Sequence, residues 1–295
     1  MPTSNPSVDA TDRSTGFRGL VRRHPIALYL ALVFGLGYSL MLGLLVLPRG
    51  IIPAGTVQGA TNLELAASAI LVFLALFPAV LIVTALEGGR PAVGALLRRM
   101  VHWRIGAGWW AVVLLALPLT TVTLALLWGD TLRSPTLDSL GKEALGFAFG
   151  FLGFNYLEET AWSGFMQTRL QRRYNVYTAA VLTAIPFAAI HMPLQIINGV
   201  TSPVGLAVAF LILMVIASLA RVFFGLVMRG AANSLLAVGL AHTTFNRSAN
   251  ATGIAALLLD GTHRQGAVLL ATALLIVLLG VILRGRSGPA VRRRT

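Results

Sequence analysis

The sequence predicts an all-α fold, a polytopic membrane bundle of about eight transmembrane helices. Of its 295 residues, 56% are hydrophobic and only 11% are charged, whereas soluble domains carry roughly 25% charged residues. Apolar runs of some twenty residues recur along the chain, and a helix of that length matches the ~30 Å hydrocarbon core of a bilayer. Lys and Arg are also distributed unequally between alternate connections, as in membrane proteins.

The eight apolar segments are separated by clusters of Pro, Gly, Asp or Arg. They fall near 26–47, 63–86, 107–128, 143–168, 176–197, 204–228, 234–246 and 267–283. The first is too long for the apolar part of a signal peptide, so we expect it to remain as a helix. The seventh is shorter than the ~17 residues needed to span a bilayer, so it is either extended by its neighbours or enclosed within the bundle.

The positive charges predict the orientation of the bundle. With the N-terminus inside and eight alternating helices, seventeen of the 23 Lys and Arg residues fall inside and five fall outside, while Arg221 lies within a span. Because cytoplasmic connections retain Lys and Arg, both termini are predicted to be cytoplasmic. The net charge of +13 then reflects topology, and we expect the lipid bilayer, with no nucleic acid, as a partner.

The chain divides into one bundle and two tails. Residues 1–24 are polar and predict a disordered cytoplasmic N-tail, residues 25–283 form the transmembrane bundle, and residues 284–295 form a basic cytoplasmic C-tail. The chain contains no cysteine, which excludes disulfides, thiolate metal sites and a cysteine nucleophile.

Four ionisable side chains lie where an apolar environment is predicted. They are Glu158, Glu159, His191 and His242, whereas the other carboxylates and histidines fall in tails, loops or segment ends. An ionisable group at membrane depth costs a few kcal/mol or more on insertion, so such groups usually mark a functional site. A single buried histidine can be purely structural, but four such groups in the second half of one chain favour a site.

Helical spacing suggests how these groups are arranged. His242 and Asn246 are four residues apart and share a helix face, as do Phe187 and His191. Glu158 and Glu159 are adjacent, so they project about 100° apart and are expected to play different roles. One should react and the other should support it.

Two kinds of chemistry suit these residues. In the first, a carboxylate in a low-dielectric site accepts a proton from water, His191 shares that water, and His242 and Asn246 stabilise the oxyanion. In the second, Glu158, His191 and His242 bind a divalent metal such as zinc and leave one position open for water. The residues alone leave both mechanisms open, and the cofactor is therefore unknown.

Three motifs resemble those of the CPBP intramembrane proteases, which include the CAAX prenyl proteases and the bacteriocin-processing and self-immunity proteins. They are Glu158-Glu159 with the following Thr-Ala-Trp-Ser-Gly-Phe, Phe187-x-x-x-His191 and His242-x-x-x-Asn246. The resemblance covers about residues 140–250. It implies an all-helical membrane fold, endopeptidase activity on a peptide or protein at the membrane, and a catalytic centre at the first glutamate and both histidines.

One position departs from the family pattern. Where the family usually has Arg, five residues after the first Glu, this chain has Ser163, on the helix face of Glu159. Our hypothesis is that Arg221 replaces the missing counter-ion. The alternative is that Arg221 extends to the cytoplasmic headgroups. Ser163 has no supporting motif for a role as nucleophile.

We therefore expect an intramembrane endopeptidase, with Glu158 as general base, Glu159 as its support, and His191, His242 and Asn246 completing the site. Two other functions are compatible with these residues. A transporter or proton relay also places Glu and His within spans, although no inverted repeat or paired broken helix is evident. A catalytically silent scaffold of the same fold is favoured by Ser163. The oligomeric state does not follow from the sequence.

Overall fold

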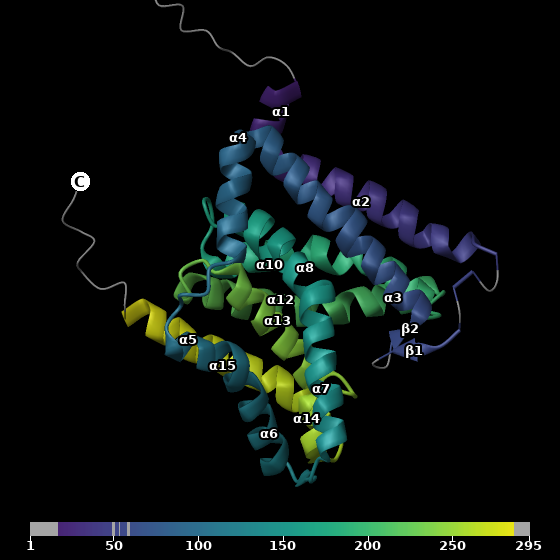
Figure 1. Ribbon diagram of the computed structural model, residues 1–295, viewed down its shortest axis with the longest axis vertical. Coiled ribbons are helices and arrows are strands. Elements are labelled where there is room, and N and C mark those ends of the chain that lie inside the picture. The colour runs from purple at the N-terminus through teal and green to yellow at the C-terminus, as the bar shows by residue number, and fades with distance from the viewer. Residues whose placement is uncertain (1–16, 49–50, 53, 58–59, 286–295) are drawn as a thin grey trace, which may run out of the picture.

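Helices dominate the protein and pack into one bundle (Figure 1). The computed structural model describes residues 17–48, 51–52, 54–57 and 60–285. Within these residues the only sheets are two antiparallel pairs of two-residue strands, β1 with β2 and β3 with β4. The predicted all-α membrane bundle is thereby confirmed.

The elements of the first half lead from the N-terminus to the matrix of helices behind the site. They are α1 (Phe17–Arg23), α2 (Pro25–Gly43), the 3₁₀ helix η1 (Leu44–Val46), β1 (Thr56–Val57), β2 (Ala60–Thr61), α3 (Asn62–Ala69), the π-helix η2 (Ile70–Leu76), α4 (Phe77–Met100), α5 (Ala107–Ala111), the π-helix η3 (Val112–Ala116), α6 (Leu117–Leu127) and β3 (Thr131–Leu132).

The second half contains every candidate site residue. Its elements are α7 (Leu137–Gly150), the π-helix η4 (Phe151–Asn155), α8 (Tyr156–Glu159), the π-helix η5 (Thr160–Gln167), α9 (Thr168–Leu170), α10 (Val176–Ile190), α11 (Met192–Ile197), α12 (Pro203–Gly230), α13 (Leu235–Ala249), α14 (Ile254–Leu258), β4 (Leu259–Asp260) and α15 (Arg264–Gly285).

Among the described residues, six helices are long and apolar enough to cross a membrane. They are Pro25–Val46, Asn62–Met100, Ala107–Leu127, Val176–Ile197, Pro203–Gly230 and Arg264–Gly285. The fourth predicted segment is also helical, in the continuous run from α7 to α9, but Asn155, Glu158 and Glu159 lower its hydropathy. The number of eight spans and the cytoplasmic side of the termini therefore stay predictions.

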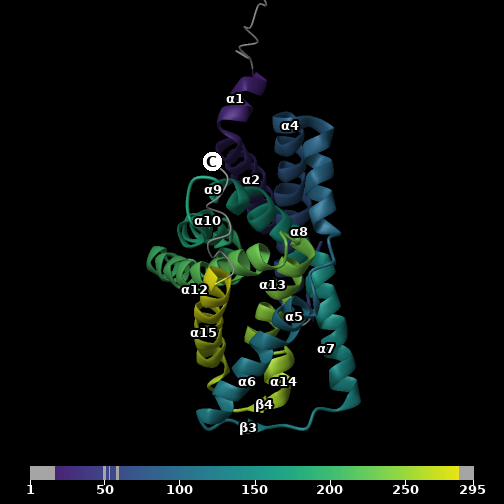
Figure 2. The same cartoon turned by 90° about the vertical axis from the view of Figure 1, so that its left-hand side faces the viewer.

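The seventh predicted segment corresponds to α13, a fifteen-residue helix enclosed by its neighbours. It contacts α8, α12, α6 and α15, among others, and lies within the bundle in both views (Figures 1 and 2). Most of its side chains are buried. A helix too short to span the bilayer can occur here because protein, not lipid, surrounds it.

The tails differ in part from the expectation. Part of the predicted disordered N-tail is helical, since α1 covers Phe17–Arg23 and buries Val21. Arg22 Nε also donates a hydrogen bond to the Glu87 carbonyl. These contacts are long-range, so local composition could not reveal them. Residues 1–16 and 286–295, which make up most of the two predicted tails, lie outside the described residues.

Polar caps fix where the site helices begin. Asn175 Oδ1 accepts from Thr178 N at the start of α10, and Ser202 Oγ accepts from Gly205 N at the start of α12. Ser234 Oγ accepts from Ala237 N at the start of α13. Each cap satisfies a backbone N–H that has no partner within its helix, which stabilises a helix by about 1 kcal/mol.

Candidate active site

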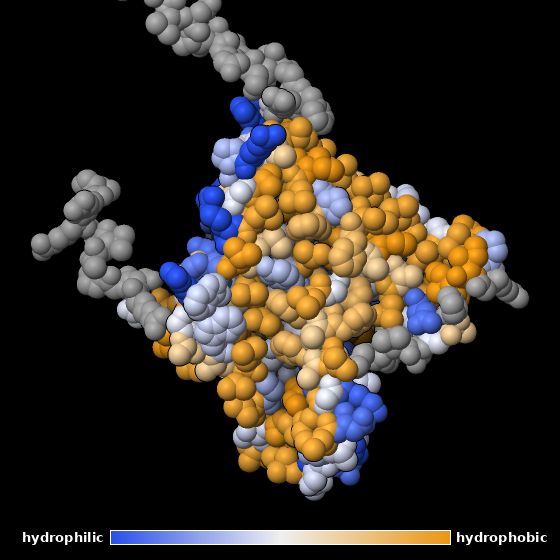
Figure 3. Space-filling view, viewed as in Figure 1, coloured by the Kyte–Doolittle hydropathy of each residue, from blue (hydrophilic) through white to orange (hydrophobic). Residues whose placement is uncertain are grey.

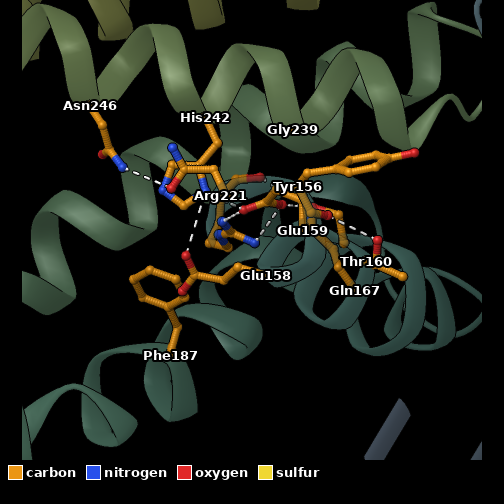
Figure 4. A network of polar contacts seen from close by, with 12 residues as sticks. Tyr156, Glu158, Glu159, Thr160, Gln167, Phe187, Arg221, Gly239, His242 and Asn246 are labelled. Carbon is orange, nitrogen blue, oxygen red and sulfur yellow. Dashed lines mark hydrogen bonds and ion pairs between the residues drawn. The ribbon is translucent and has the colours of Figure 1, made fainter. Parts of the chain in front are cut away.

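The candidate residues converge at the centre of the bundle from separate elements (Figure 4). Glu158 and Glu159 lie on α8, His191 lies between α10 and α11, and His242 and Asn246 lie on α13. Two π-helices, η4 and η5, flank α8 directly. Such wide turns are uncommon and occur frequently at functional sites.

Glu158 faces a cavity and keeps one oxygen without a partner. The cavity has a volume of about 250 Å³, and Glu158, His191, Asn246 and Asn155 contribute to its lining. Glu158 Oε1 lies 3.5 Å from His191 Nε2, and Glu158 Oε2 lies 4.0 Å from His242 Nδ1. Although Oε1 is buried, no described residue forms a hydrogen bond with it. A buried carboxylate oxygen in this condition has room to bind water.

The backbone orients the His191 ring. Its Nδ1 lies 2.7 Å from the carbonyl oxygen of Phe187, one helical turn earlier. Since a carbonyl can only accept, Nδ1 carries a proton, and Nε2 of the neutral ring presents a lone pair towards Glu158. Phe187 packs against the same ring with a centroid separation of 4.5 Å. The pair Phe187 and His191 therefore acts as one positioned unit.

Glu159, in contrast, has a full set of donors. Its Oε2 accepts from Ser163 Oγ at 2.5 Å and from Arg221 Nη1 at 3.0 Å. Its Oε1 pairs with Arg221 Nη2 and lies 2.8 Å from His242 Nδ1. The side chain is completely inaccessible to solvent. The adjacent glutamates thus occupy different environments, one open to a cavity and the other fixed in place.

Arg221 lies deep in the bundle. Its side chain is 1% exposed, and its guanidinium carbon lies 4.8 Å from the Phe187 ring centroid and 5.0 Å from that of Phe224. These aromatic faces add a cation–π attraction to the ion pair with Glu159. Arg221 therefore does not extend to the headgroups, and the alternative reading of this residue was wrong.

His242 and Asn246 lie on one face of α13 but contact different partners. His242 approaches Glu159, and its ring packs 5.1 Å from the Phe224 ring. Because an ionised carboxylate only accepts, the His242 Nδ1 facing it is the donor. Asn246 instead borders the cavity, where its Nδ2 donates to Asn155 Oδ1 at 3.2 Å.

Asn155 is a site residue that the sequence reasoning missed. It is buried, donates from Nδ2 to Thr243 Oγ1 at 3.1 Å, and accepts from Asn246. Thr243 Oγ1 in turn donates to the Gly239 carbonyl. A signal was available, because Asn155 is the one amide in an apolar stretch and lies three residues before Glu158, on the same helix face.

The depth at which His191 lies also differs from a straight-helix estimate. Counting regular turns from the cytoplasmic ends places His191 several ångströms deeper than the glutamates, yet its Nε2 is within 3.5 Å of Glu158. The helix run that carries Glu158 contains η4 and η5, and α10 contains Pro186. Neither element has the uniform rise per residue that the estimate assumes.

The donor set does not fit a metal site. Among the described residues, no three His, Asp or Glu side chains are grouped so that they could hold a metal ion. Glu158 and His191 face each other, but His242 Nδ1 is directed to Glu159 rather than to a common point with them. We therefore derive no step through a metal.

The comparison with known families supports the resemblance seen in the three motifs. Residues 140–248 match the family model described as type II CAAX prenyl endopeptidase Rce1-like. No curated protein matches the chain. The matched segment extends from α7 to α13 and contains all five candidate catalytic residues, together with Arg221. Residues 140–248 thus carry a domain similar to the Rce1-like type II CAAX prenyl endopeptidases, which confirms the resemblance to the CPBP family.

Proposed function

We propose that the protein is an intramembrane endopeptidase, similar to the CAAX proteases, in which Glu158 activates water to hydrolyse a peptide bond. The observation that carries this proposal is the contrast between the two glutamates. Glu159 is saturated by Arg221, Ser163 and His242, whereas Glu158 borders the cavity with an unpartnered oxygen. The Rce1-like match supports the same reaction class.

The geometry suits a water held between Glu158 and His191. The ionised carboxylate and the neutral Nε2 are both acceptors, and they lie 3.5 Å apart. A water molecule in the adjoining cavity can donate one proton to each, which exposes its oxygen lone pair to a peptide carbonyl. Glu158 then takes a proton as the oxygen attacks, and later delivers it to the leaving amine.

The developing oxyanion needs donors on the other side of the cavity. One N–H of Asn246 is engaged by Asn155, which leaves the second available. We assign this group, together with His242 when its ring is protonated, to oxyanion stabilisation. Removal of a single such donor typically costs two to three orders of magnitude in rate, or about 3–4 kcal/mol. The mechanism forms no covalent intermediate with the enzyme.

Asn155 positions the Asn246 amide. Thr243 Oγ1 gives its proton to the Gly239 carbonyl, so it must accept from Asn155 Nδ2. That assignment directs Asn155 Oδ1 to Asn246 Nδ2 and sets which end of the Asn246 side chain carries the donors. The order of donors and acceptors along this chain therefore fixes the oxyanion donor.

The test uses the purified full-length protein in lipid nanodiscs with a fluorogenic peptide library, including peptides with a prenylated cysteine. Cleavage should be abolished by Glu158→Gln and by His191→Ala. Thr272→Val is a matched control, because Thr272 is buried on α15 and bonds only to the Val268 carbonyl. Absence of cleavage by the wild type, or cleavage that survives both substitutions, would contradict the proposal and favour a scaffold or a proton relay.

A further inference from the structure

A second pocket lies between α4 and the η5–α9 segment and shares no lining residue with the catalytic cavity. Its volume is about 310 Å³. The polar side chains that line it are Thr84, Glu87, Arg99, Thr168, Arg169 and Arg172. Three guanidinium groups thus face one carboxylate, and the wall carries an excess of positive charge.

Only one of the three arginines is neutralised. Arg169 forms a salt bridge with Glu87 and also donates from Nη1 to the Phe165 carbonyl. Arg99 donates to the carbonyls of Asn233 and Gly164, and no described carboxylate lies within salt-bridge distance of it. Neutral acceptors satisfy its N–H groups but leave its charge uncompensated, which is costly in a partly buried position.

Like charges also converge at this pocket. Arg169 lies within electrostatic reach of both Arg99 and Arg172. Arg172 is exposed, and among the described residues it forms no ion pair. An anion held between these groups would relieve their mutual repulsion and complete the charge balance that Glu87 alone does not provide.

Thr84 supplies an independent indication of a ligand. Its side chain is only 4% exposed and lines the pocket, yet its hydroxyl has no hydrogen-bond partner among the described residues. A threonine within a helix commonly bonds back to the carbonyl one turn earlier. A buried hydroxyl that does not do so is a donor for an acceptor in the pocket.

The backbone of α4 contributes to the same pocket. The helix is interrupted at Gly89, where φ is 66° and ψ is −163°, and Pro91 follows. A helix that restarts at this point leaves its first N–H groups without intrahelical carbonyls and favours negative charge. Gly88 and Ala92, on either side of the break, both line the pocket.

We propose that this pocket binds the phosphate of an anionic phospholipid headgroup. Arginine forks, a hydroxyl and a helix N-terminus are the donors that phosphate oxygens require, and basic pockets at the ends of membrane helices bind anionic headgroups. The acyl chains have a surface beside the pocket, since Ile82 and Leu97 on α4 are 48% and 43% exposed. Figure 3 shows hydrophilic residues bordering a broad hydrophobic face near α1 and α4.

Native mass spectrometry of the full-length protein tests this proposal without reference to protease activity. The detergent-purified protein is titrated with phosphatidylglycerol and with phosphatidylcholine of the same chain length. The wild type should retain phosphatidylglycerol preferentially, and Arg172→Gln should weaken that binding about fivefold. Thr84→Val should weaken it as well. Both variants avoid Arg99, whose contacts with Gly164 and Asn233 also serve the fold.

Arg98→Gln is the matched control, because Arg98 lies on the same helix, is exposed and does not line the pocket. It should bind phosphatidylglycerol as the wild type does. Equal retention of the two lipids, or an equal loss in Arg98→Gln and Arg172→Gln, would overturn the proposal. Displacement of the lipid by an equal concentration of inorganic phosphate would also overturn it, and would assign the pocket to free phosphate.

Discussion

Arg221 on α12 and Glu159 on α8 form a buried ion pair across 62 residues of sequence. Ser163 donates to the same carboxylate from one turn along the helix of Glu159. The related proteases usually carry an arginine at the Ser163 position, so here the positive charge comes from another helix. The charge balance around Glu159 is retained although its source has moved.

Arg221→Gln is expected to destabilise the fold strongly. It leaves a fully buried carboxylate without a counter-ion, and breaking such a pair costs about 3–5 kcal/mol. Thermal unfolding in detergent should therefore show a clear fall in Tm. Arg173→Gln removes an exposed arginine and should leave Tm unchanged. A Tm for Arg221→Gln equal to that of this control would refute the structural role of the ion pair.

The family arrangement should be recoverable by a double substitution. Arg221→Ala vacates the space beside Glu159, and Ser163→Arg adds a guanidinium at a side chain that already contacts this carboxylate. Each single variant should be unstable, the first through a missing charge and the second through overpacking of a fully buried site. The double variant should regain Tm relative to both. A strictly additive loss would show that the two positions are not interchangeable.

The two glutamates should respond differently to the same chemical change. Glu158→Gln should lower kcat by about a hundredfold to ten-thousandfold, because it removes the general base, while Tm stays near that of the wild type. Glu159→Gln should lower Tm, because Arg221 then remains buried and unpaired. Measurement of kcat and Tm for both variants separates the roles. If Glu158→Gln retained full activity, Glu158 could not be the base.

Asn155→Leu should impair catalysis through Asn246. It removes the acceptor that orients the Asn246 amide, and a misplaced catalytic group costs between about tenfold and a hundredfold in rate. The loss should appear in kcat more than in KM. Asn155→Asp keeps the acceptor oxygens and should recover part of kcat. Combination with Asn246→Ala should add little, whereas fully multiplicative effects would place Asn155 outside this chain of hydrogen bonds.

The proposed water activation also predicts the response to chelators. Since no step passes through a metal, prolonged treatment with EDTA or 1,10-phenanthroline should leave cleavage within about twofold of the untreated rate. Elemental analysis of the active protein checks the same point. Inactivation that added zinc reverses would favour the metal-assisted alternative, in which His242 would have to turn from Glu159 towards Glu158.

The sequence predicted the fold class and the set of candidate polar residues because both depend on local properties. An ionisable group within an apolar run is visible from composition alone, as Glu158, Glu159, His191 and His242 were. The spacing of His242 and Asn246 likewise placed them on one face of a helix. These signals require no knowledge of how helices pack.

The features that the sequence did not predict are those set by packing. Asn155 became part of the site only because α8 and α13 are adjacent. The depth of His191 depended on π-helical turns that residue counting treats as regular. The helix at Phe17–Arg23 is held by Arg22 against a carbonyl on α4. In each case the deciding partner is distant in sequence.

The catalytic cavity is walled in part by helices from outside the family-matched segment. Leu65, Ser68, Leu71 and Val72 on α3 and η2 line it, and Tyr38 on α2 donates to the Ala189 carbonyl just before His191. A fragment trimmed to residues 140–248 would therefore open its catalytic water to lipid tails. The recurring unit in sequence is smaller than the unit that can keep water at this depth, and truncation experiments should be designed around the larger one.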